Sequence, residues 1–294
     1  MTETTTGTLD DARRMIEEVE GLPTLPTVVS ELLERASDPD TTVGNITEII
    51  ENDPALNAKI LKLVNSAFYG LPRRISSLKT AVSILGFNAI RNIVLATSIF
   101  NLFSKRRIGF NSEGFWIHCL SCGVSCTVLG RRLKQTAERS DFVYGLLHDV
   151  GKILLAVHKE DLVARVLQTA REKRLSFCEA EREVIGVTHA QIGAALAEKW
   201  RFPEGLVRAI HYHHNVEAAG PGLTEAALVH VSDTFIRALQ LGWCGDDTVD
   251  AVSEIAWNAL NLTDRDVGAV MDDLMSGLIG ASPFIDLILQ PKRA

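Results

Sequence analysis

The sequence has no long apolar run, few cysteines and no excess of positive charge. No segment approaches the ~20 consecutive apolar residues that a membrane-spanning helix needs, so we expect no membrane partner. The threonine-rich segment 1–10 lacks the basic and apolar parts of a secretion signal. Five cysteines in 294 residues suit a reducing compartment better than a disulfide framework. Together these absences predict a cytoplasmic protein.

The net charge of −7 disfavours general binding to nucleic acid or anionic lipid, because both carry negative charge. We therefore expect no direct DNA binding. Small basic clusters stand at 73–74, 105–107 and 131–132. Solvated helix ends explain them most simply, and a local contact with phosphate or RNA is the alternative.

Helical patterns dominate the chain, and the alternating pattern of a strand is nearly absent. Asp53 followed by Pro54 is typical of a helix start. The segments 176–179 and 188–191 fit the capping box. Apolar residues at helical period predict one continuous helix over 141–157. The sequence therefore predicts an all-α fold of about a dozen helices joined by short loops.

Histidines and carboxylates are the residues from which chemistry could arise. Neutral imidazole and carboxylate oxygen bind divalent iron, manganese, zinc or nickel, and several helices can bring them together in a bundle core. Each single histidine is more simply a capping or surface residue, so their order alone establishes no site. The candidates, in chain order, are His118, His148, Asp149, His189, His211, His213, His214 and Asp233.

The adjacent His148 and Asp149 lie in the apolar segment 142–152, which the pattern places inside a helix. An ionised aspartate there costs several kcal/mol unless it is paired or binds a metal. Lys152, one helical turn later, offers a structural partner for Asp149. Ion pair and metal ligand both stay open at this point.

Three cysteines, Cys119, Cys122 and Cys126, follow His118 with C-x2-C-x3-C spacing. Iron–sulfur or zinc binding is one interpretation. On a continuous helix they share one face, where cysteine behaves as a small buried hydrophobe, and packing is the favoured interpretation. The sequence has no Walker loop, Rossmann fingerprint or G-x-S-x-G elbow.

The stretch FVYGLLHDVGK at 142–152 resembles the defining motif of the HD superfamily of metal-dependent phosphohydrolases. The wider sequence is similar to one branch of that superfamily, the HDOD domain. This resemblance extends over 22–216 and is carried by LPTLP at 22–26, DPAL at 53–56, ILKLVNSAFYG at 60–70, and the segments 75–86 and 200–214.

The resemblance predicts a multi-helix HD-superfamily-like bundle with an N-terminal helical subdomain. The HDOD domain would comprise a helical part, 22–110, and an HD-like part, 111–216. An N-terminal extension, 1–21, would be loosely attached. Helices in 217–294 would complete the bundle. Within that last part, the amphipathic segment 263–279 either covers the main body or forms a homodimer contact.

The resemblance also implies a ligand set. The residues that match the metal-binding positions of the superfamily are His118, His148, Asp149, His189, His213, His214 and Asp233. Our hypothesis is one or two divalent ions that share Asp149. The first ion would add His118, His148 and Asp233, and the second the other three histidines. The candidate catalytic residues are Asp149 and Lys152. Of these two, Lys152 would face a phosphate oxygen of the substrate.

Two departures from the HD-GYP relatives, which hydrolyse cyclic di-GMP, limit this hypothesis. Gly114 stands where those relatives carry a glutamate, and Glu113 is one residue out of register, which argues against a third metal. The chain after His214 lacks their glycine-tyrosine-proline loop, which argues against a cyclic dinucleotide substrate.

HDOD domains commonly lack a complete metal set and are regarded as regulatory. The resemblance thus predicts a signal-transduction protein with a divalent-metal site, which responds to a signalling protein or a nucleotide-like ligand. One alternative is an active metal-dependent phosphohydrolase or phosphodiesterase acting on a nucleotide or a cyclic nucleotide. The other is a protein-interaction module without metal, in which 65–70 would be the contact segment. The simpler interpretation of 65–70 is the end of a helix packed on the core.

Overall fold

The computed structural model describes residues 7–36, 40–66, 69, 71–103, 111–133 and 141–289. Within these ranges the chain forms only helices and loops, so the predicted all-α fold is confirmed. The basic cluster at 105–107 and half of the 65–70 segment, residues 67, 68 and 70, lie outside the described residues. No single helix in the described part has the length and apolar composition of a membrane span. Two consecutive helices, Leu78–Leu85 and Phe87–Phe103, have that length and composition only when taken together, and they are bent by 117° where they meet.

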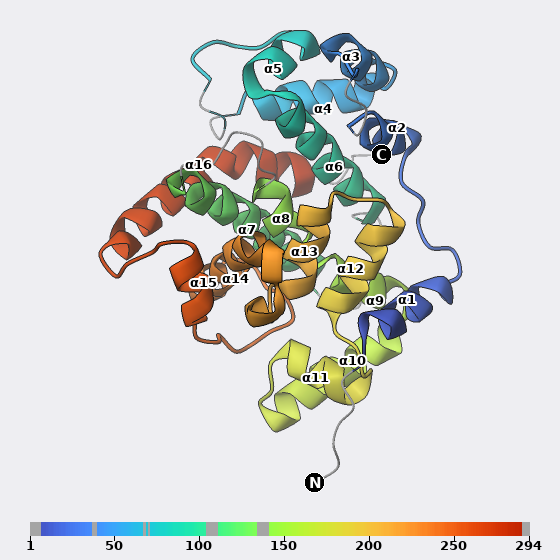
Figure 1. Cartoon of the computed structure of the whole chain (residues 1–294), viewed down its shortest axis with the longest axis vertical. Coiled ribbons are helices and arrows are strands. Elements are labelled where there is room, and N and C mark those ends of the chain that lie inside the picture. Colours follow the sequence, from blue (N-terminus) through green and yellow to red (C-terminus); the bar gives the residue numbers. More distant parts are fainter. Residues whose placement is uncertain are drawn as a thin grey trace.

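The helices of residues 27–103 form an upper lobe, and the last of them runs down into the main body (Figure 1). They are α2 (Thr27–Ala36), α3 (Val43–Glu51), α4 (Pro54–Val64), α5 (Leu78–Leu85) and α6 (Phe87–Phe103). As predicted, Asp53 caps α4 by accepting from the amides of Ala55 and Leu56. Residues of α6 from Ile90 to Phe103 are mostly buried, because α6 packs on helices of both lobes.

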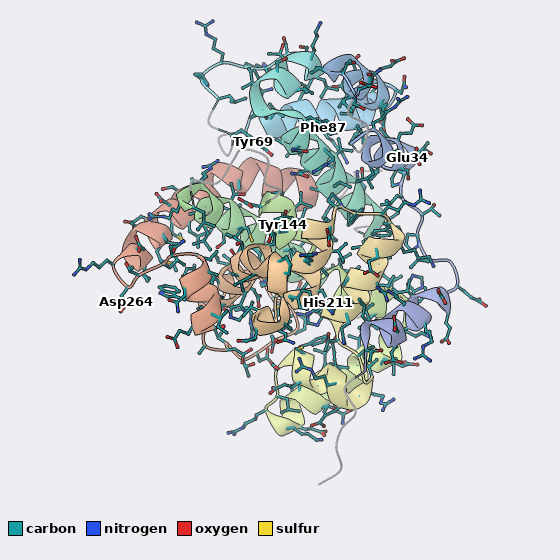
Figure 2. The ribbon with its side chains drawn as sticks, viewed as in Figure 1. Glu34, Tyr69, Phe87, Tyr144, His211 and Asp264 are labelled. Atoms are coloured by element: carbon teal, nitrogen blue, oxygen red, sulfur yellow. The ribbon has the colours of Figure 1, made fainter. Side chains whose placement is uncertain are left out.

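The main body is built around α7, which packs against α8, α14 and α16 (Figure 1). Its principal helices are α7 (Ser112–Arg132), α8 (Asp141–Leu147), α9 (Val150–His158), α12 (His189–Lys199), α13 (Glu204–Tyr212), α14 (Leu223–Ala238), α15 (Glu254–Ala259) and α16 (Asp266–Leu289). Two further helices, α10 (Glu160–Lys173) and α11 (Phe177–Val184), pack on each other at one end. Figure 2 shows side chains of both lobes, with Phe87 in the upper lobe and Tyr144 in the main body.

The first helix, α1 (Leu9–Glu17), docks on α12, contrary to the expected loose attachment. Ala12 and Ile16 are buried in the contact. Arg13 makes a two-point ion pair with Glu198 of α12, with N···O distances of 2.9 and 3.0 Å. The described part of the N-terminal segment is therefore integral to the main body.

The prediction of one continuous helix over 141–157 is wrong at one point. The chain leaves the helix at His148 and Asp149, which separate α8 from α9. Helix α8 packs mainly on α7, whereas α9 packs on α12. Two different partners require two different axes, and the turn between them carries the histidine–aspartate pair.

Two glycines allow the close backbone approaches that fix this turn. A Cβ at Gly145 would lie 2.4 Å from the carbonyl of Cys122 on α7. A Cβ at Gly151 would lie 2.1 Å from the carbonyl oxygen of His189 on α12. Because any side chain would force these helices apart, both glycines hold the turn within reach of α7 and α12.

Candidate metal centre

All seven predicted ligands meet at one place in the main body, and all but the half-buried His214 are almost fully buried. Three helices and two turns supply them. His118 lies on α7, His148 and Asp149 in the turn between α8 and α9, His189 at the start of α12, His213 and His214 just after α13, and Asp233 on α14. His211 is half-buried, stacks on Tyr212 and belongs to none of the clusters that could hold a metal (Figure 2).

The two carboxylate oxygens of Asp149 face different histidines. Oδ1 lies 3.1 Å from Nε2 of His189 and 3.8 Å from Nε2 of His213. Oδ2 lies 3.3 Å from Nε2 of His148 and 4.0 Å from Nε2 of His118. This is the arrangement of a carboxylate that bridges two cations.

Asp233 completes the side of the centre that faces α7. Its Oδ1 lies 3.2 Å from Nε2 of His118 and 3.9 Å from Nε2 of His148. Its Oδ2 accepts from the Arg237 guanidinium at 3.2 Å. Burial opposes ionisation of Asp233, but His118 and Arg237 outweigh it and hold the pKa of this carboxyl well below its usual range.

Backbone carbonyls orient two of the histidines. Nδ1 of His148 donates to the Gly145 carbonyl at 2.7 Å, and Nδ1 of His213 donates to the Ile210 carbonyl at 2.7 Å. A carbonyl only accepts, so in the neutral rings Nδ1 carries the proton and Nε2 presents a lone pair to the centre. Burial lowers the pKa of His213 well below its usual value, which keeps this ring neutral.

A carboxylate orients the third histidine. Nδ1 of His189 donates to Oε2 of Glu181 at 2.6 Å, and the same oxygen accepts the His189 amide at 2.8 Å. Burial would lower the pKa of His189, but Glu181 and Asp149 outweigh it and raise the value. A proton and a metal ion are therefore alternatives on Nε2 of His189.

The donor atoms fit a divalent ion in spacing. Ligand atoms ~2.0–2.3 Å from a tetrahedral ion lie ~3.3–3.8 Å from one another. Nε2 of His189 lies 3.4 Å from Nε2 of His213 and 3.1 Å from Nε2 of His214. Two clusters satisfy the geometry of a metal site on four side chains each: His118, Cys122, His148 and Asp233, and Asp149, His189, His213 and His214.

Two further properties of the centre fit a divalent ion: buried polar atoms without hydrogen bonds, and an excess of negative charge. Nε2 of His148 and Oδ1 of Asp149 are buried and make no hydrogen bond of acceptable geometry. Such atoms are costly unless something binds them. Four buried carboxylates, Asp149, Glu181, Asp233 and Asp246, face two buried cations, Lys152 and Arg237. With neutral histidines, two negative charges remain, which is the charge that a divalent ion balances.

Lys152 lies within the centre as the partner of Asp149. Its Nζ donates to Oδ2 of Asp149 at 2.9 Å and stands 5.0 Å from the centre of the Phe177 ring. Burial opposes the charge on Asp149, but His148 and Lys152 outweigh it and keep the pKa of Asp149 well below its usual value. The ion-pair interpretation of Lys152 is thus present in the structure beside the ligand geometry of Asp149.

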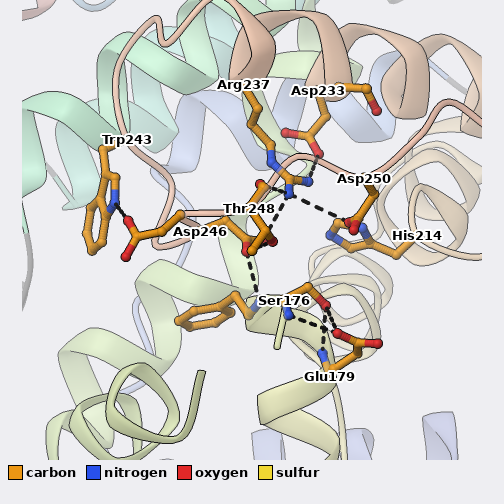
Figure 3. A network of polar contacts seen from close by, with 12 residues as sticks. Ser176, Glu179, His214, Asp233, Arg237, Trp243, Asp246, Thr248 and Asp250 are labelled. Carbon is orange, nitrogen blue, oxygen red and sulfur yellow. Dashed lines mark hydrogen bonds and ion pairs between the residues drawn. The ribbon is translucent and has the colours of Figure 1, made fainter. Parts of the chain in front are cut away.

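A loop that we name the strap, residues 242–250, lies against the centre, because its Cys244 is close to His118 and Asp149. Arg237 ties it down by donating to the Thr248 carbonyl and pairing with Asp246 at 3.5 Å and Asp250 at 3.6 Å (Figure 3). Asp246 in turn accepts the amide of Phe177, at the start of α11, at 3.1 Å. The strap thereby joins α14 to α11 across the buried ligands.

Gly114, which stands where the HD-GYP relatives carry a glutamate, contacts the strap in the structure. The Gly114 carbonyl accepts the amide of Trp243, in the strap, at 2.9 Å. His230 supports the backbone beside the centre: Nδ1 donates to the His213 carbonyl and Nε2 accepts the Ser253 amide, each at 2.9 Å.

Four residues near the candidate ligands were missed by the sequence analysis: Cys122 as a neighbour of the centre, Glu181, Arg237 and Cys244. Cys244, in the strap, forms a further cluster with His118 and Asp149. Glu181 had a signal in the sequence, because it follows Phe177 by four residues on the buried face of α11. The strap residues had none, since only tertiary packing brings this loop to the centre.

The sequence pattern of the HDOD domain family matches residues 22–216 of this chain. An uncharacterised protein from Treponema pallidum is 26% identical over 209 residues, which are 71% of this chain and 40% of that protein. The uncharacterised protein YuxH of Bacillus subtilis is 28% identical over 130 residues, 44% of this chain and 31% of YuxH. The chain thus spans less than half the length of both relatives.

Solved structures share the fold. An HDOD domain protein of unknown function from Geobacter sulfurreducens has a TM-score of 0.80 at 27% identity, over 96% of this chain and 98% of that one. A candidate phosphohydrolase from Shewanella amazonensis has a TM-score of 0.72 at 24% identity, over 98% and 100% of the two chains. A candidate signal transduction protein from Marinobacter aquaeolei has a TM-score of 0.70 at 22% identity, over 96% and 65%.

Proposed function

Since this chain belongs to the HDOD domain family, whose pattern covers most of its length, we propose that it is a regulatory signalling protein built around a divalent-metal centre. The observation that carries the proposal is the pair of buried acceptors formed by Nε2 of His148 and Oδ1 of Asp149, neither of which makes a hydrogen bond of acceptable geometry. The other ring nitrogen of His148 already donates to a carbonyl, and the other oxygen of Asp149 already accepts from Lys152. Buried acceptors without a donor are costly unless a cation binds them.

One or two ions would bind, with Asp149 shared between them. His118, His148 and Asp233 would hold the first ion, and His189, His213 and His214 the second. Imidazole and carboxylate ligands suit iron, manganese, zinc or nickel. The signal would come from a partner protein or a nucleotide-like ligand.

The burial of the ligands supports regulation over rapid turnover. Apart from His214, every ligand is almost fully enclosed, and the strap lies against the centre. A signalling partner that responds to the metal state through the strap needs no access to the ions, whereas a phosphoester substrate needs direct contact with them.

Hydrolysis of a phosphoester is the second candidate function, and the two-sided placement of Asp149 favours it. A pair of divalent ions would supply Lewis acidity to a phosphoryl group. His214 is the most exposed of the ligands, so a substrate would enter on its side. Lys152 would have to leave Asp149 to contact a phosphate oxygen.

Metal analysis of protein purified without chelator tests the centre. We expect at least one equivalent of a transition metal after reconstitution with iron, manganese, zinc or nickel. The test variant is Asp149→Asn combined with Lys152→Met, which removes both members of the buried ion pair and leaves neither charge uncompensated. The control is His211→Gln, which changes a histidine outside the clusters. Less than a tenth of an equivalent in the parent protein would contradict the proposal.

Activity assays separate the two candidate functions. The reconstituted protein would be incubated with a generic phosphodiester, nucleotides and cyclic dinucleotides. Turnover that the Asp149→Asn, Lys152→Met variant abolishes would establish the hydrolase. Full metal occupancy with no turnover, together with a partner whose binding changes on chelation, supports the regulatory role. A partner that binds equally with and without metal supports the metal-free module.

A further inference from the structure

Helix α7 presents a thiol to the centre one turn after His118. Sγ of Cys122 lies 3.5 Å from Nε2 of His118, and both are almost fully buried. His148 and Asp233 belong to the same cluster, in which every donor atom lies within 4.8 Å of the others. Nε2 of His148 is buried there and makes no hydrogen bond.

The spacing of Sγ and Nε2 is that of two ligands on one ion. Thiolate sulfur binds zinc at ~2.3 Å and imidazole nitrogen at ~2.0–2.1 Å, so at a tetrahedral angle the two atoms stand ~3.5 Å apart. The distance from Nε2 of His118 to Oδ1 of Asp233, 3.2 Å, fits a nitrogen and an oxygen ligand in the same way.

The neighbouring cysteines of α7 lack this geometry. Cys126 lies one turn further along and directs its thiol to the Leu228 carbonyl at 3.6 Å. Cys119 is packed in the hydrophobic core and belongs to no candidate metal cluster. The predicted packing role therefore suits these two, whereas Cys122, which also packs in an apolar cluster, differs from them in the contact of its thiol with His118.

We propose that Cys122 is an additional ligand of the ion held by His118, His148 and Asp233 and shared with Asp149, so that this position is a mixed nitrogen, oxygen and sulfur site. The proposal rests on the metal binding proposed above. On binding, the thiol gives its proton to solvent and the thiolate coordinates the ion. A soft thiolate selects zinc over manganese or magnesium.

The second cluster has a different chemistry. Asp149, His189, His213 and His214 offer only nitrogen and oxygen atoms. Such a set binds iron or manganese as well as zinc. The two positions would thus differ in metal preference, with the sulfur-containing one filled by zinc.

Cobalt(II) substitution tests the ligand directly. Thiolate coordination to Co²⁺ gives an intense near-ultraviolet charge-transfer band, which nitrogen and oxygen ligands do not. We expect this band in the full-length protein, its loss in Cys122→Ser and Cys122→Ala, and its retention in the matched control Cys126→Ser. We also expect Cys122→Ser to weaken Zn²⁺ binding at this position about 100-fold and Mn²⁺ binding less than about threefold. Circular dichroism checks that each variant folds.

The outcomes distinguish this proposal from the one on which it rests. Cobalt that binds without the band would overturn the thiolate ligand and leave the metal centre intact. The 3.5 Å contact is then only a weak thiol hydrogen bond. A band that persists in Cys122→Ser and disappears in Cys244→Ser would assign the sulfur to the strap instead and also overturn the proposal. No binding of cobalt or zinc at all would overturn the metal centre itself.

Discussion

Glu181 holds His189 by two hydrogen bonds to a single carboxylate oxygen, one from the ring at 2.6 Å and one from the backbone amide at 2.8 Å. The two residues lie eight positions apart, on α11 and at the start of α12. The pairing aims Nε2 of His189 at Oδ1 of Asp149, 3.1 Å away. A carboxylate behind a histidine in this way fixes the ring and raises its basicity as a ligand.

Replacing Glu181 should therefore weaken metal binding without removing a ligand. We expect Glu181→Gln to lower the affinity for the ion at Asp149 and His189 by about 10–100-fold. Competition with a chelating dye measures it. Glu183→Gln, on the same helix but paired at the surface with Lys173, is the control and should leave the affinity unchanged. Equal affinities for both variants would contradict the positioning role of Glu181.

Lys152 should oppose metal binding, because its charge lies 2.9 Å from the carboxylate that the ions would share. We expect Lys152→Met to bind metal about tenfold more tightly. Without metal the variant should be less stable than the parent by about 3–5 kcal/mol, since Asp149 loses its buried partner. Thermal unfolding with and without metal measures both effects. Weaker binding in Lys152→Met would contradict the prediction, and the exposed Lys173→Met is the control.

The metal-free protein should lose stability on acidification near the ordinary histidine pKa of 6.5. Burial lowers the pKa values of His118, His213 and His214, so these rings stay neutral when folded and take up protons when unfolded. Each such proton lowers the free energy of unfolding by about 1.4 kcal/mol per pH unit as the pH falls below 6.5.

His189 contributes with the opposite sign. Its pKa is raised, so its stabilisation is complete at low pH and is lost as the pH rises through the folded value. Three lowered values outweigh one raised value. Urea unfolding in the presence of chelator should therefore show at least about 1 kcal/mol less stability at pH 5.5 than at pH 7.5. Equal or greater stability at pH 5.5 would contradict neutral buried histidines.

Arg237 should control the strap. Arg237→Gln leaves Asp233 and Asp246 without their buried cation and should cost about 3–5 kcal/mol. Arg237→Lys keeps the charge but cannot bridge Asp233 and the Thr248 carbonyl with a fixed fork, so a smaller loss is expected. Both variants should exchange the amides of 243–250 faster, as measured by hydrogen exchange.

A surface arginine provides the comparison. Arg208 pairs with Glu204 at the surface of α13, where such pairs contribute about 0–1 kcal/mol. Arg208→Lys should leave both stability and exchange in the strap nearly unchanged. If Arg237→Gln has no larger effect than Arg208→Lys, the strap is not anchored by Arg237.

Local signals in the sequence determined much of the fold. Asp53 caps α4, and both capping boxes, at Ser176 and Thr188, form as predicted. These predictions succeed because a cap depends on atoms three residues apart, whose geometry is fixed by the helix itself. The family resemblance supplied the seven candidate ligand positions, which the structure brings together, and their binding of a metal stays a prediction.

Tertiary structure decided the rest of the centre. The break at His148 and Asp149 follows from α8 packing on α7 and α9 on α12, which a continuous apolar pattern does not reveal. The neighbours Glu181 and Arg237 act through contacts between elements whose alignment depends on packing. By itself the sequence determined which residues could bind a metal, because ligand chemistry belongs to the side chain. Only the folded chain decided which atoms face one another and which charges surround them, because both depend on how helices distant in sequence approach.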